Sequence, residues 1–248
     1  MLKRHAYDQL LNWKNRKTKQ GLLITGARQV GKTTLIEQFG ADHYEHVAKV
    51  NFIEMPQAVE TVSKAKDTED LILRLSVLSG TEITPGKTLL FLDEIQACED
   101  MLTWTKFLSG AKGLDVIVSG SLLGIDVFNV RSIPVGFLQT MRMYPLNFYE
   151  FCAACRLPQP ALDTLRECYV DRREVPDYLH ERLTDLWYKY LLIGGMPDAV
   201  QSFVDSADIV KVRNTQQAIF DTYEYDITKY VSDLVERRRS EEHTSELQ

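Results

Sequence analysis

Gly26-Ala27-Arg28-Gln29-Val30-Gly31-Lys32-Thr33-Thr34 follows the short apolar run Gly21-Leu-Leu-Ile-Thr25 and leads into residues 32–39, whose apolar side chains recur with helical spacing. Residues 26–33 fit the pattern G-x₄-G-K-[ST] without deviation. Glycine lets the backbone curl so that its N–H groups face an anion, and the start of a helix adds a positive dipole end. A buried strand, a glycine-rich turn and a helix in this order predict a phosphate-binding loop.

The loop residues predict separate roles at a nucleotide. Lys32 would reach the β- and γ-phosphates, and the Thr33 hydroxyl would ligate Mg²⁺. The alternative is a glycine-rich turn that carries a lysine by chance, and the flanking strand and helix weaken that interpretation. We therefore expect residues 26–34 to bind the phosphates of a nucleotide, with ATP favoured, together with Mg²⁺.

The second element of this site is the hydrophobic run Thr88-Leu-Leu-Phe-Leu92, which Asp93 and Glu94 follow directly. A carboxylate at a strand tip beside the loop can hold the magnesium water shell, and we assign this role to Asp93. Glu94 would orient and deprotonate the attacking water. Alone, an apolar run that ends in two acids is a common solvated strand end. Paired with the loop, it favours hydrolysis over transfer to a small molecule.

Further polar residues follow the fourth apolar run, which ends at Ser119-Gly120-Ser121. A hydroxyl there would hydrogen-bond the γ-phosphate or the lytic water. Strand alternation admits either serine, and Ser121 is preferred to Ser119. A charge-stabilising arginine is also expected. Arg131 and Arg142 are its candidates, with a solvated surface position as the alternative for each, and Arg28 is expected to brace the loop or a neighbouring subunit.

Apolar runs alternate with helical patterns over the first half of the chain, which predicts an α/β fold with a parallel sheet covered by helices on both faces. Residues 122–147 then mix glycine, proline and apolar residues, after which helical spacing returns. We divide the chain into a core of residues 1–150 and a helical segment of residues 151–238. The expected strands are residues 21–25, 47–53, 88–92 and 114–119, and the expected helices are residues 3–16, 32–39, 57–65, 69–78, 99–110, 160–169, 178–193, 198–204 and 207–236.

The last residues, 239–248, read RSEEHTSELQ and show no helical or strand period. A disordered tail is the simplest interpretation. The string also resembles the frame translation of a common short-read sequencing adapter. We expect it to be such an artefact, outside the fold, and the natural protein to continue beyond Arg238.

Composition limits the class of protein. With 44% hydrophobic and 26% charged residues, the chain is typical of a soluble globular protein, and the absence of any long apolar run predicts a cytoplasmic protein without a membrane span. A formal charge of −6 argues against broad electrostatic attraction to nucleic acid. The pair Cys152 and Cys155 lies in an apolar stretch, and we interpret it as small buried residues on a helix rather than a zinc site.

Six short motifs follow one another along the chain: GARQVGKTT, LLFLDEIQ, the SGS after the fourth strand, Tyr144-Pro-Leu-Asn-Phe-Tyr-Glu-Phe151, Gly194-Gly-Met-Pro197 and Tyr225-Asp-Ile-Thr-Lys-Tyr230. Together they resemble the bacterial and archaeal AAA-like P-loop ATPases that carry a C-terminal DUF4143 domain. The resemblance implies an AAA-like core, an all-helical segment and further C-terminal sequence, truncated in this chain.

The same resemblance implies that Gly195-x-Pro197 is a GxP motif whose proline lies near the adenine. From the residues alone, glycine and proline would end one helix before Asp198 begins another, and both interpretations can hold. The chain departs from the family at Gly136-Phe137, where many members carry a Gly-Arg or Gly-Lys pair. Arg131 and Arg142 are not clear replacements for that basic residue.

These observations predict Mg-dependent binding of ATP and its slow hydrolysis, which would drive a conformational change in an attached helical or C-terminal domain. One alternative is an ATP/ADP-dependent binding switch with little turnover, which recruits a protein partner. A small-molecule kinase is a second alternative, disfavoured by the Asp93–Glu94 pair. A third is a nucleic-acid-directed ATPase whose recognition domain is missing, and oligomerisation is left open.

Overall fold

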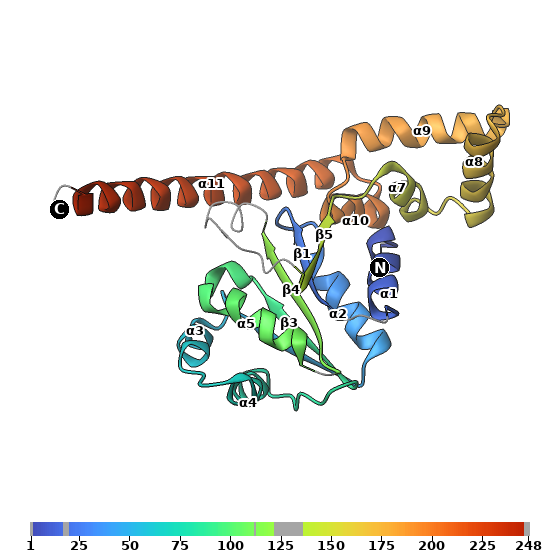
Figure 1. The fold of residues 1–248 in the computed structure, drawn as a ribbon. Coiled ribbons are helices and arrows are strands. Elements are labelled where there is room, and N and C mark those ends of the chain that lie inside the picture. Colours follow the sequence, from blue (N-terminus) through green and yellow to red (C-terminus); the bar gives the residue numbers. More distant parts are fainter. Residues whose placement is uncertain (1, 17–19, 112, 122–135, 246–248) are drawn as a thin grey trace. The chain divides into compact units, whose positions relative to one another are not determined.

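The computed structural model describes residues 2–16, 20–111, 113–121 and 136–245, with side chains described as far as residue 228. The chain forms two compact units. One unit is Ala6–Met143, and the other combines Met1–His5 with Tyr144–Gln248. Figure 1 shows a sheet with helices in the first unit and helices throughout the described part of the second.

The first unit contains a five-stranded sheet in which every pair of neighbouring strands is parallel. The strand order is β2-β3-β4-β1-β5. This arrangement confirms the predicted α/β fold class. Its strands are β1 (Gly21–Gly26), β2 (His46–Asn51), β3 (Thr88–Asp93), β4 (Asp115–Ser121) and β5 (Leu138–Met143).

Strand β5 corrects the sequence prediction, which treats residues 122–147 as irregular. It pairs with β1 along its whole length, from Gly21 opposite Leu138 to Gly26 opposite Met143. Because β5 lies at the edge of the sheet, half of it is polar or exposed, and it lacks the continuous apolar run that identifies a central parallel strand. The apolar signal on which the other strand predictions depend is therefore absent.

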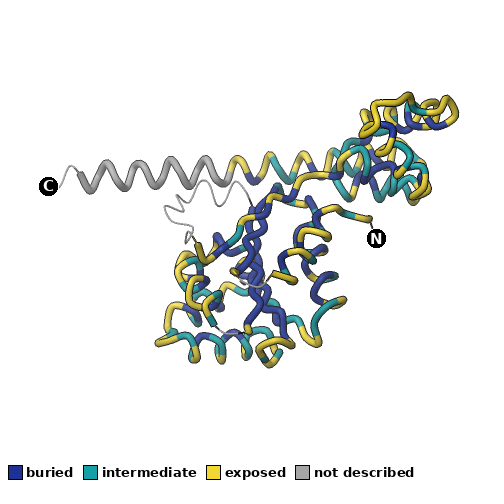
Figure 2. Tube along the Cα trace, turned by 45° about the vertical axis from the view of Figure 1, so that its right-hand side comes forward, coloured by how far each residue is buried: buried dark blue, intermediate teal, exposed yellow. Residues whose placement is uncertain are grey.

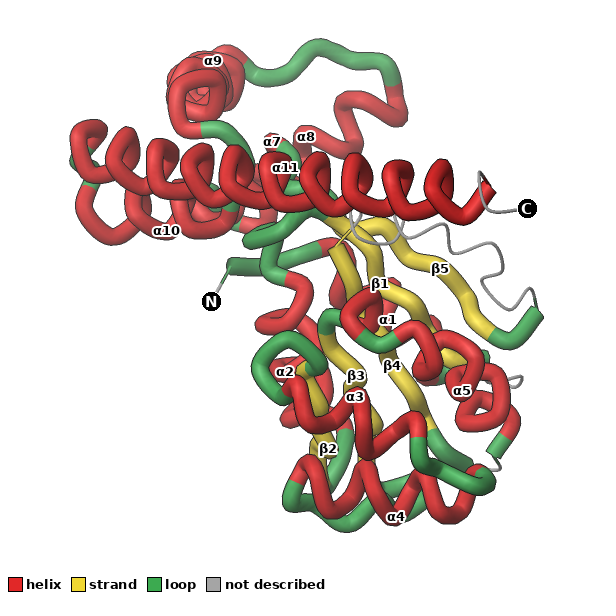
Figure 3. Tube along the Cα trace, turned by 90° about the vertical axis from the view of Figure 1, so that its left-hand side faces the viewer, coloured by secondary structure: helices red, strands yellow, loops and turns green. Residues whose placement is uncertain are grey.

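Helices cover both faces of the sheet, as Figures 1 and 3 show. Side chains of α1 (His5–Lys14) and α2 (Lys32–His43) pack with Leu22, Phe91 and Ile117 on one face, which we call the α2 face. The other face, the α5 face, carries α3 (Pro56–Ser63), α4 (Thr68–Ser79) and α5 (Glu99–Gly110).

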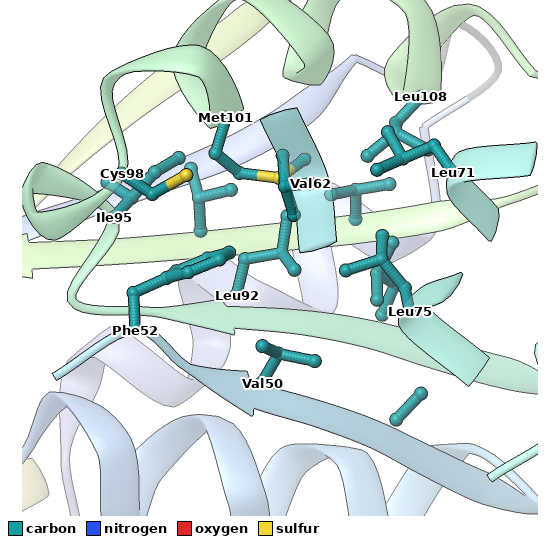
Figure 4. Close-up of a cluster of buried hydrophobic side chains, with 14 of the residues drawn as sticks. Val50, Phe52, Val62, Leu71, Leu75, Leu92, Ile95, Cys98, Met101 and Leu108 are labelled. Carbon is teal, nitrogen blue, oxygen red and sulfur yellow. The ribbon is translucent and has the colours of Figure 1, made fainter. Parts of the chain in front are cut away.

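The α5 face holds a dense apolar core that includes Leu71, Leu75, Leu92 and Met101 (Figure 4). The strands between the two helical layers are buried along almost their full length, apart from parts of β2 and β5 (Figure 2). Burial on both faces explains why β1, β3 and β4 read as unbroken apolar runs. The sheet is thus a rigid support for the residues at its carboxyl edge.

The described helices of the second unit are α7 (Phe148–Ala154), α8 (Gln159–Asp171), α9 (Asp177–Ile193), α10 (Pro197–Ser206) and α11 (Ile209–Ser245). Asn147 and Glu150 form a reciprocal capping box at the start of α7. The Glu150 carboxylate also accepts hydrogen bonds from the backbone N–H of His5 at 2.7 Å and from Arg4 Nε at 3.3 Å. These contacts hold the N-terminal residues in this unit.

Helix α11 extends to Ser245 and so includes residues 239–245, for which the sequence shows no helical period. No glycine or proline interrupts residues 209–245, so nothing in that stretch breaks a helix once it has begun. No helix among the described residues is long and apolar enough to cross a membrane.

Candidate nucleotide-binding site

The loop between β1 and α2 has the backbone that its glycines predict. Gly31 has φ 90° and Gln29 has φ 58°, so the chain takes left-handed conformations twice before α2 begins at Lys32. Gly26 is required for a different reason. A Cβ atom on Gly26 would lie 2.4 Å from the backbone oxygen of Met143, on the neighbouring strand. The first glycine of the loop therefore lets two backbones approach closely.

The predicted phosphate-binding residues differ in their exposure. Val30 is fully buried in the core of the α2 face and anchors the loop to the sheet. Ala27 and Arg28 are partly exposed, while Gln29 and Thr34 are exposed. The loop thus combines partly exposed and exposed residues with one buried apolar side chain that packs in the core.

Lys32 is almost fully buried, at 6% exposure, although its side chain is charged. Its Nζ donates hydrogen bonds to the backbone oxygens of Gly26 at 3.0 Å and Ala27 at 2.8 Å. Burial lowers the pKa of Lys32, while the negative charges of Glu94 and Asp93 raise it and Arg28 lowers it again. Lys32 therefore lies close enough to interact electrostatically with both predicted carboxylates. Their attraction does not offset the burial, so the charged form of Lys32 is less favourable in the folded protein than in water.

Asp93, at the end of β3, is the centre of a hydrogen-bonded cluster on the α2 face. The Thr33 hydroxyl donates to Asp93 Oδ2 at 3.0 Å, and Asn51 Nδ2 approaches the same oxygen at 3.4 Å. The Ser119 hydroxyl donates to Asp93 Oδ1. Asp93 is 2% exposed, so these donors replace the water that its carboxylate would otherwise bind.

The sequence prediction includes Thr33 and Asp93 but omits Asn51 as a partner. Asn51 ends β2 exactly in register with Asp93 on β3, and Ser119 lies on the next strand, β4. Carboxyl ends of adjacent parallel strands meet at one edge of a sheet. The predicted strand 47–53 runs two residues past Asn51, so the sequence prediction does not place this polar residue at the end of the strand.

Glu94 follows Asp93 in a left-handed conformation, with φ 54° and ψ 46°. Its backbone N–H donates to Asp93 Oδ1 at 3.1 Å. Its side chain is only partly exposed, and its Oε2 accepts a hydrogen bond from Gln96 Nε2. Gln96 is a further residue of this site that the sequence prediction does not include.

The remaining candidates of the first unit occupy different places. Ser121 is buried and lies in register with Gly26, whereas its alternative, Ser119, is the serine that bonds to Asp93. Arg142 is exposed on β5 in register with Thr25, and strand alternation places it on the α5 face, opposite Asp93. Arg131 lies outside the described residues.

Pro197 belongs to the helical unit, where it is the first residue of α10 and follows the end of α9 at Ile193. Proline suits this position because its missing N–H would have no partner in the first turn. Gly195 lies against the backbone of Leu146, whose N–H donates to the Gly195 oxygen at 2.6 Å. A Cβ on Gly195 would lie 2.2 Å from the Leu146 oxygen, so this glycine serves a close backbone contact.

The donor atoms near the loop suit Mg²⁺ bound together with phosphate. Within the described part of the chain, no group of three or more His, Cys, Asp or Glu side chains could hold a metal ion. Mg²⁺ commonly takes one or two protein oxygens, with phosphate oxygens and water completing its shell. Thr33 Oγ1 and Asp93 Oδ2, 3.0 Å apart, are such a pair of oxygens.

Comparison with protein families matches residues 18–152, more than half of the chain, to a family described as AAA domain (AAA_14). No curated protein matches the chain by sequence. A structure of a Walker-type ATPase of Pyrococcus abyssi has a TM-score of 0.51 and 13% identity, covering 97% of this chain and 77% of that one. At this identity the likeness concerns the fold alone.

Two other solved structures have lower TM-scores. AMPPCP-bound DnaA from Aquifex aeolicus has a TM-score of 0.46 and 16% identity, covering 82% of this chain and 59% of that chain. Drosophila ORC bound to DNA has a TM-score of 0.42 and 15% identity, covering 86% of this chain and 66% of that chain. The family match stands independently of these structures. The chain belongs to the AAA domain family.

Proposed function

We propose that this protein binds Mg-ATP at the loop of residues 26–34 and at the carboxyl ends of β3 and β4, and hydrolyses it slowly. The observation that carries the proposal is the 3.0 Å hydrogen bond from Thr33 to Asp93. This bond connects Thr33, which follows the loop lysine, to Asp93, which ends β3. It supports a single site formed by two elements that lie 60 residues apart in the sequence.

In the proposed site, backbone N–H groups of the loop and the start of α2 bind phosphate oxygens. Lys32 balances phosphate charge, and Thr33 and Asp93 hold Mg²⁺, which neutralises charge on the phosphates when it is bound. The cost of burying the Lys32 ammonium supports this role, because an anion beside it would offset that cost.

Glu94 is proposed as the residue that orients the attacking water and accepts its proton. The water oxygen forms a bond to the γ-phosphorus, the bond from phosphorus to the ADP oxygen breaks, and the products are ADP and inorganic phosphate. Glu94 is suited to this role because the residue is partly exposed, whereas Asp93 is buried and already accepts several hydrogen bonds.

We further propose that nucleotide turnover changes the conformation of the helical unit. The path of the chain supports this coupling. Gly26, in the loop, lies against Met143, the last residue of β5. The chain enters the helical unit at the next residue, and Leu146 in turn bonds to Gly195, close to Pro197. A shift of the loop at Gly26 would therefore act on the segment that leads into the helical unit.

The test is phosphate release by the full chain, measured for the wild type, Lys32→Ala and Glu94→Gln, with and without Mg²⁺. We expect turnover only in the wild type with Mg²⁺ present. Lys32→Ala should lose nucleotide binding, and Glu94→Gln should keep it. Equal activity in all three proteins would contradict the proposed mechanism.

A comparison of turnover regimes separates an enzyme from a binding switch. An enzyme releases product and continues through many cycles at excess ATP. A switch completes one cycle and then retains ADP. If phosphate release stops after one equivalent per site, the protein acts as a binding switch and not as an enzyme with slow turnover.

A further inference from the structure

Gln96 is the side chain that contacts the carboxylate of Glu94. It lies in the one-turn helix Ile95–Ala97, directly after Glu94, and its Nε2 donates a hydrogen bond to Glu94 Oε2. Gln96 is 7% exposed, so its amide is held by the protein rather than by solvent. A carboxylate oxygen can only accept, which fixes the orientation of the amide with its N–H toward Glu94.

The backbone around Glu94 is fixed on both sides. Its N–H is bound to Asp93, and its left-handed φ of 54° is a conformation that residues with a side chain adopt rarely. The next residue, Ile95, is fully buried in the core of the α5 face, beside Cys98 and Phe52 (Figure 4). With the backbone held in this way, only the side-chain torsions of Glu94 remain free, and the bond from Gln96 restricts them.

The other end of the Gln96 amide is not satisfied. Its Oε1 is buried and accepts no hydrogen bond from the residues that the structure describes. A buried amide oxygen without a partner costs free energy, so this glutamine is a poor choice for stability alone. An apolar side chain of the same size would fill the position at lower cost.

We propose that Gln96 is a positioning residue, which holds the Glu94 carboxylate in the orientation needed to receive the proton of the attacking water. The inference rests on the proposed function of Glu94 and extends it. Gln96 itself touches neither nucleotide nor water in this account. It acts through Glu94 alone.

The test begins with Gln96→Met, which keeps the length and volume of the side chain and removes the amide. We expect kcat to fall by about tenfold or more, because an unrestrained Glu94 adopts the reactive orientation less often. The KM for Mg-ATP and the Kd measured with a non-hydrolysable ATP analogue should stay within about twofold. The Tm should be unchanged or higher, since an unsatisfied buried group is removed.

A double-mutant cycle with Glu94→Gln tests whether Gln96 acts through Glu94. In the Glu94→Gln background, Gln96→Met should change the residual single-turnover rate by less than about twofold. Val62→Ala is the matched structural control, because it alters a fully buried position of the same core, on α3, that does not adjoin Glu94. It should lower the Tm and leave kcat within about twofold of the wild type.

Three results would overturn the inference while leaving the proposed function intact. Gln96→Met could retain the wild-type kcat, or lose Tm and nucleotide affinity together as a structural residue would. Its effect on rate could also be as large without Glu94 as with it. If instead Glu94→Gln hydrolyses ATP like the wild type, the proposed function of Glu94 fails, and the role of Gln96 fails with it.

Discussion

The Thr33 hydroxyl donates a hydrogen bond of 3.0 Å to Asp93 Oδ2, and so joins the first turn of α2 to the carboxyl end of β3. The same carboxylate also accepts from Ser119 on β4. This arrangement places a hydroxyl and a carboxylate beside the phosphate-binding loop before any ligand is considered. The site is therefore organised by the protein itself, and changes to either residue should alter cation binding more than folding.

Thr33→Val removes the hydroxyl and keeps the shape of the side chain. We expect the affinity for Mg-ATP to fall by about 10–100-fold, since one oxygen near the cation is lost. The free energy of unfolding should fall by about 1 kcal/mol, the net worth of one hydrogen bond. Isothermal titration calorimetry and urea unfolding measure the two effects. Thr33→Ser should retain the affinity. Thr61→Val, at a partly exposed position of α3 whose hydroxyl also donates one hydrogen bond, is the matched control.

Lys32→Met should stabilise the protein without nucleotide while abolishing ATP binding. Burial holds the pKa of Lys32 below its ordinary value of 10.5, so the unfolded chain binds the lysine proton more tightly than the folded chain does. The free energy of unfolding of the wild type therefore rises with pH between the lowered pKa and 10.5. The advantage of Lys32→Met should be largest at neutral pH and should narrow across that interval.

Urea unfolding of both proteins at neutral and alkaline pH measures this difference. The exposed Lys211 on α11 gives the control variant Lys211→Met, for which we expect no comparable gain. A Lys32→Met protein that is less stable than the wild type at neutral pH would show that the ammonium is stabilised, not strained, in the folded state.

Gly26→Ala should destabilise the first unit, because the new Cβ would lie 2.4 Å from the Met143 oxygen. Relief of that overlap requires β1 and β5 to separate, and we expect a loss of about 1–3 kcal/mol. Gly110→Ala is the matched control, since a Cβ at Gly110, the last residue of α5, meets nothing within 4 Å. Thermal unfolding compares the two, and equal Tm values would argue against the close approach of the strands.

Cys152 and Cys155 should react slowly with iodoacetamide in the folded protein. Burial raises the pKa of Cys152 to about 12, with a smaller contribution from Cys155, and burial raises the pKa of Cys155 as well. The reactive thiolate is therefore scarce at pH 8. Mass spectrometry should find Cys152 unmodified under native conditions and modified in denaturant. Rapid native labelling of Cys152 would contradict its interpretation as a buried structural residue. Cys155 departs from that interpretation, because it is only partly buried and follows the last residue of α7.

The sequence was sufficient for the fold class because β1, β3 and β4 are buried on both faces and keep unbroken apolar runs. It was insufficient for β5, an edge strand whose polar residues hide its strand character. The tail was likewise treated as irregular up to Gln248, whereas α11 continues to Ser245.

The sequence was sufficient to predict the motif residues of the site but not the hydrogen bonds between them and their neighbours. The pattern of residues 26–33 follows from local backbone chemistry, so a linear motif identifies it. The bonds from Asn51 and Ser119 to Asp93 depend on the register between strands, which a single sequence does not state. The contact of Gln96 with Glu94 depends on the left-handed turn at Glu94.

Several predictions from the sequence stay predictions. These are the DUF4143 domain, a cytoplasmic location, a protein or nucleic-acid partner, and oligomerisation. The roles of Ser121, Pro197 and the charge-stabilising arginine have the same standing.

The most direct test is a single-turnover measurement on wild type and Glu94→Gln, with Mg-ATP binding and phosphate formation followed in the same samples. Glu94 is only partly exposed and its carboxylate is bound by Gln96, so the amide variant preserves its shape and its place. We predict a Kd for Mg-ATP within about threefold of the wild type and a rate of phosphate formation lower by about 100-fold or more. An unchanged rate, or a loss of binding equal to that of Lys32→Ala, would contradict the assignment of Glu94 to the attacking water.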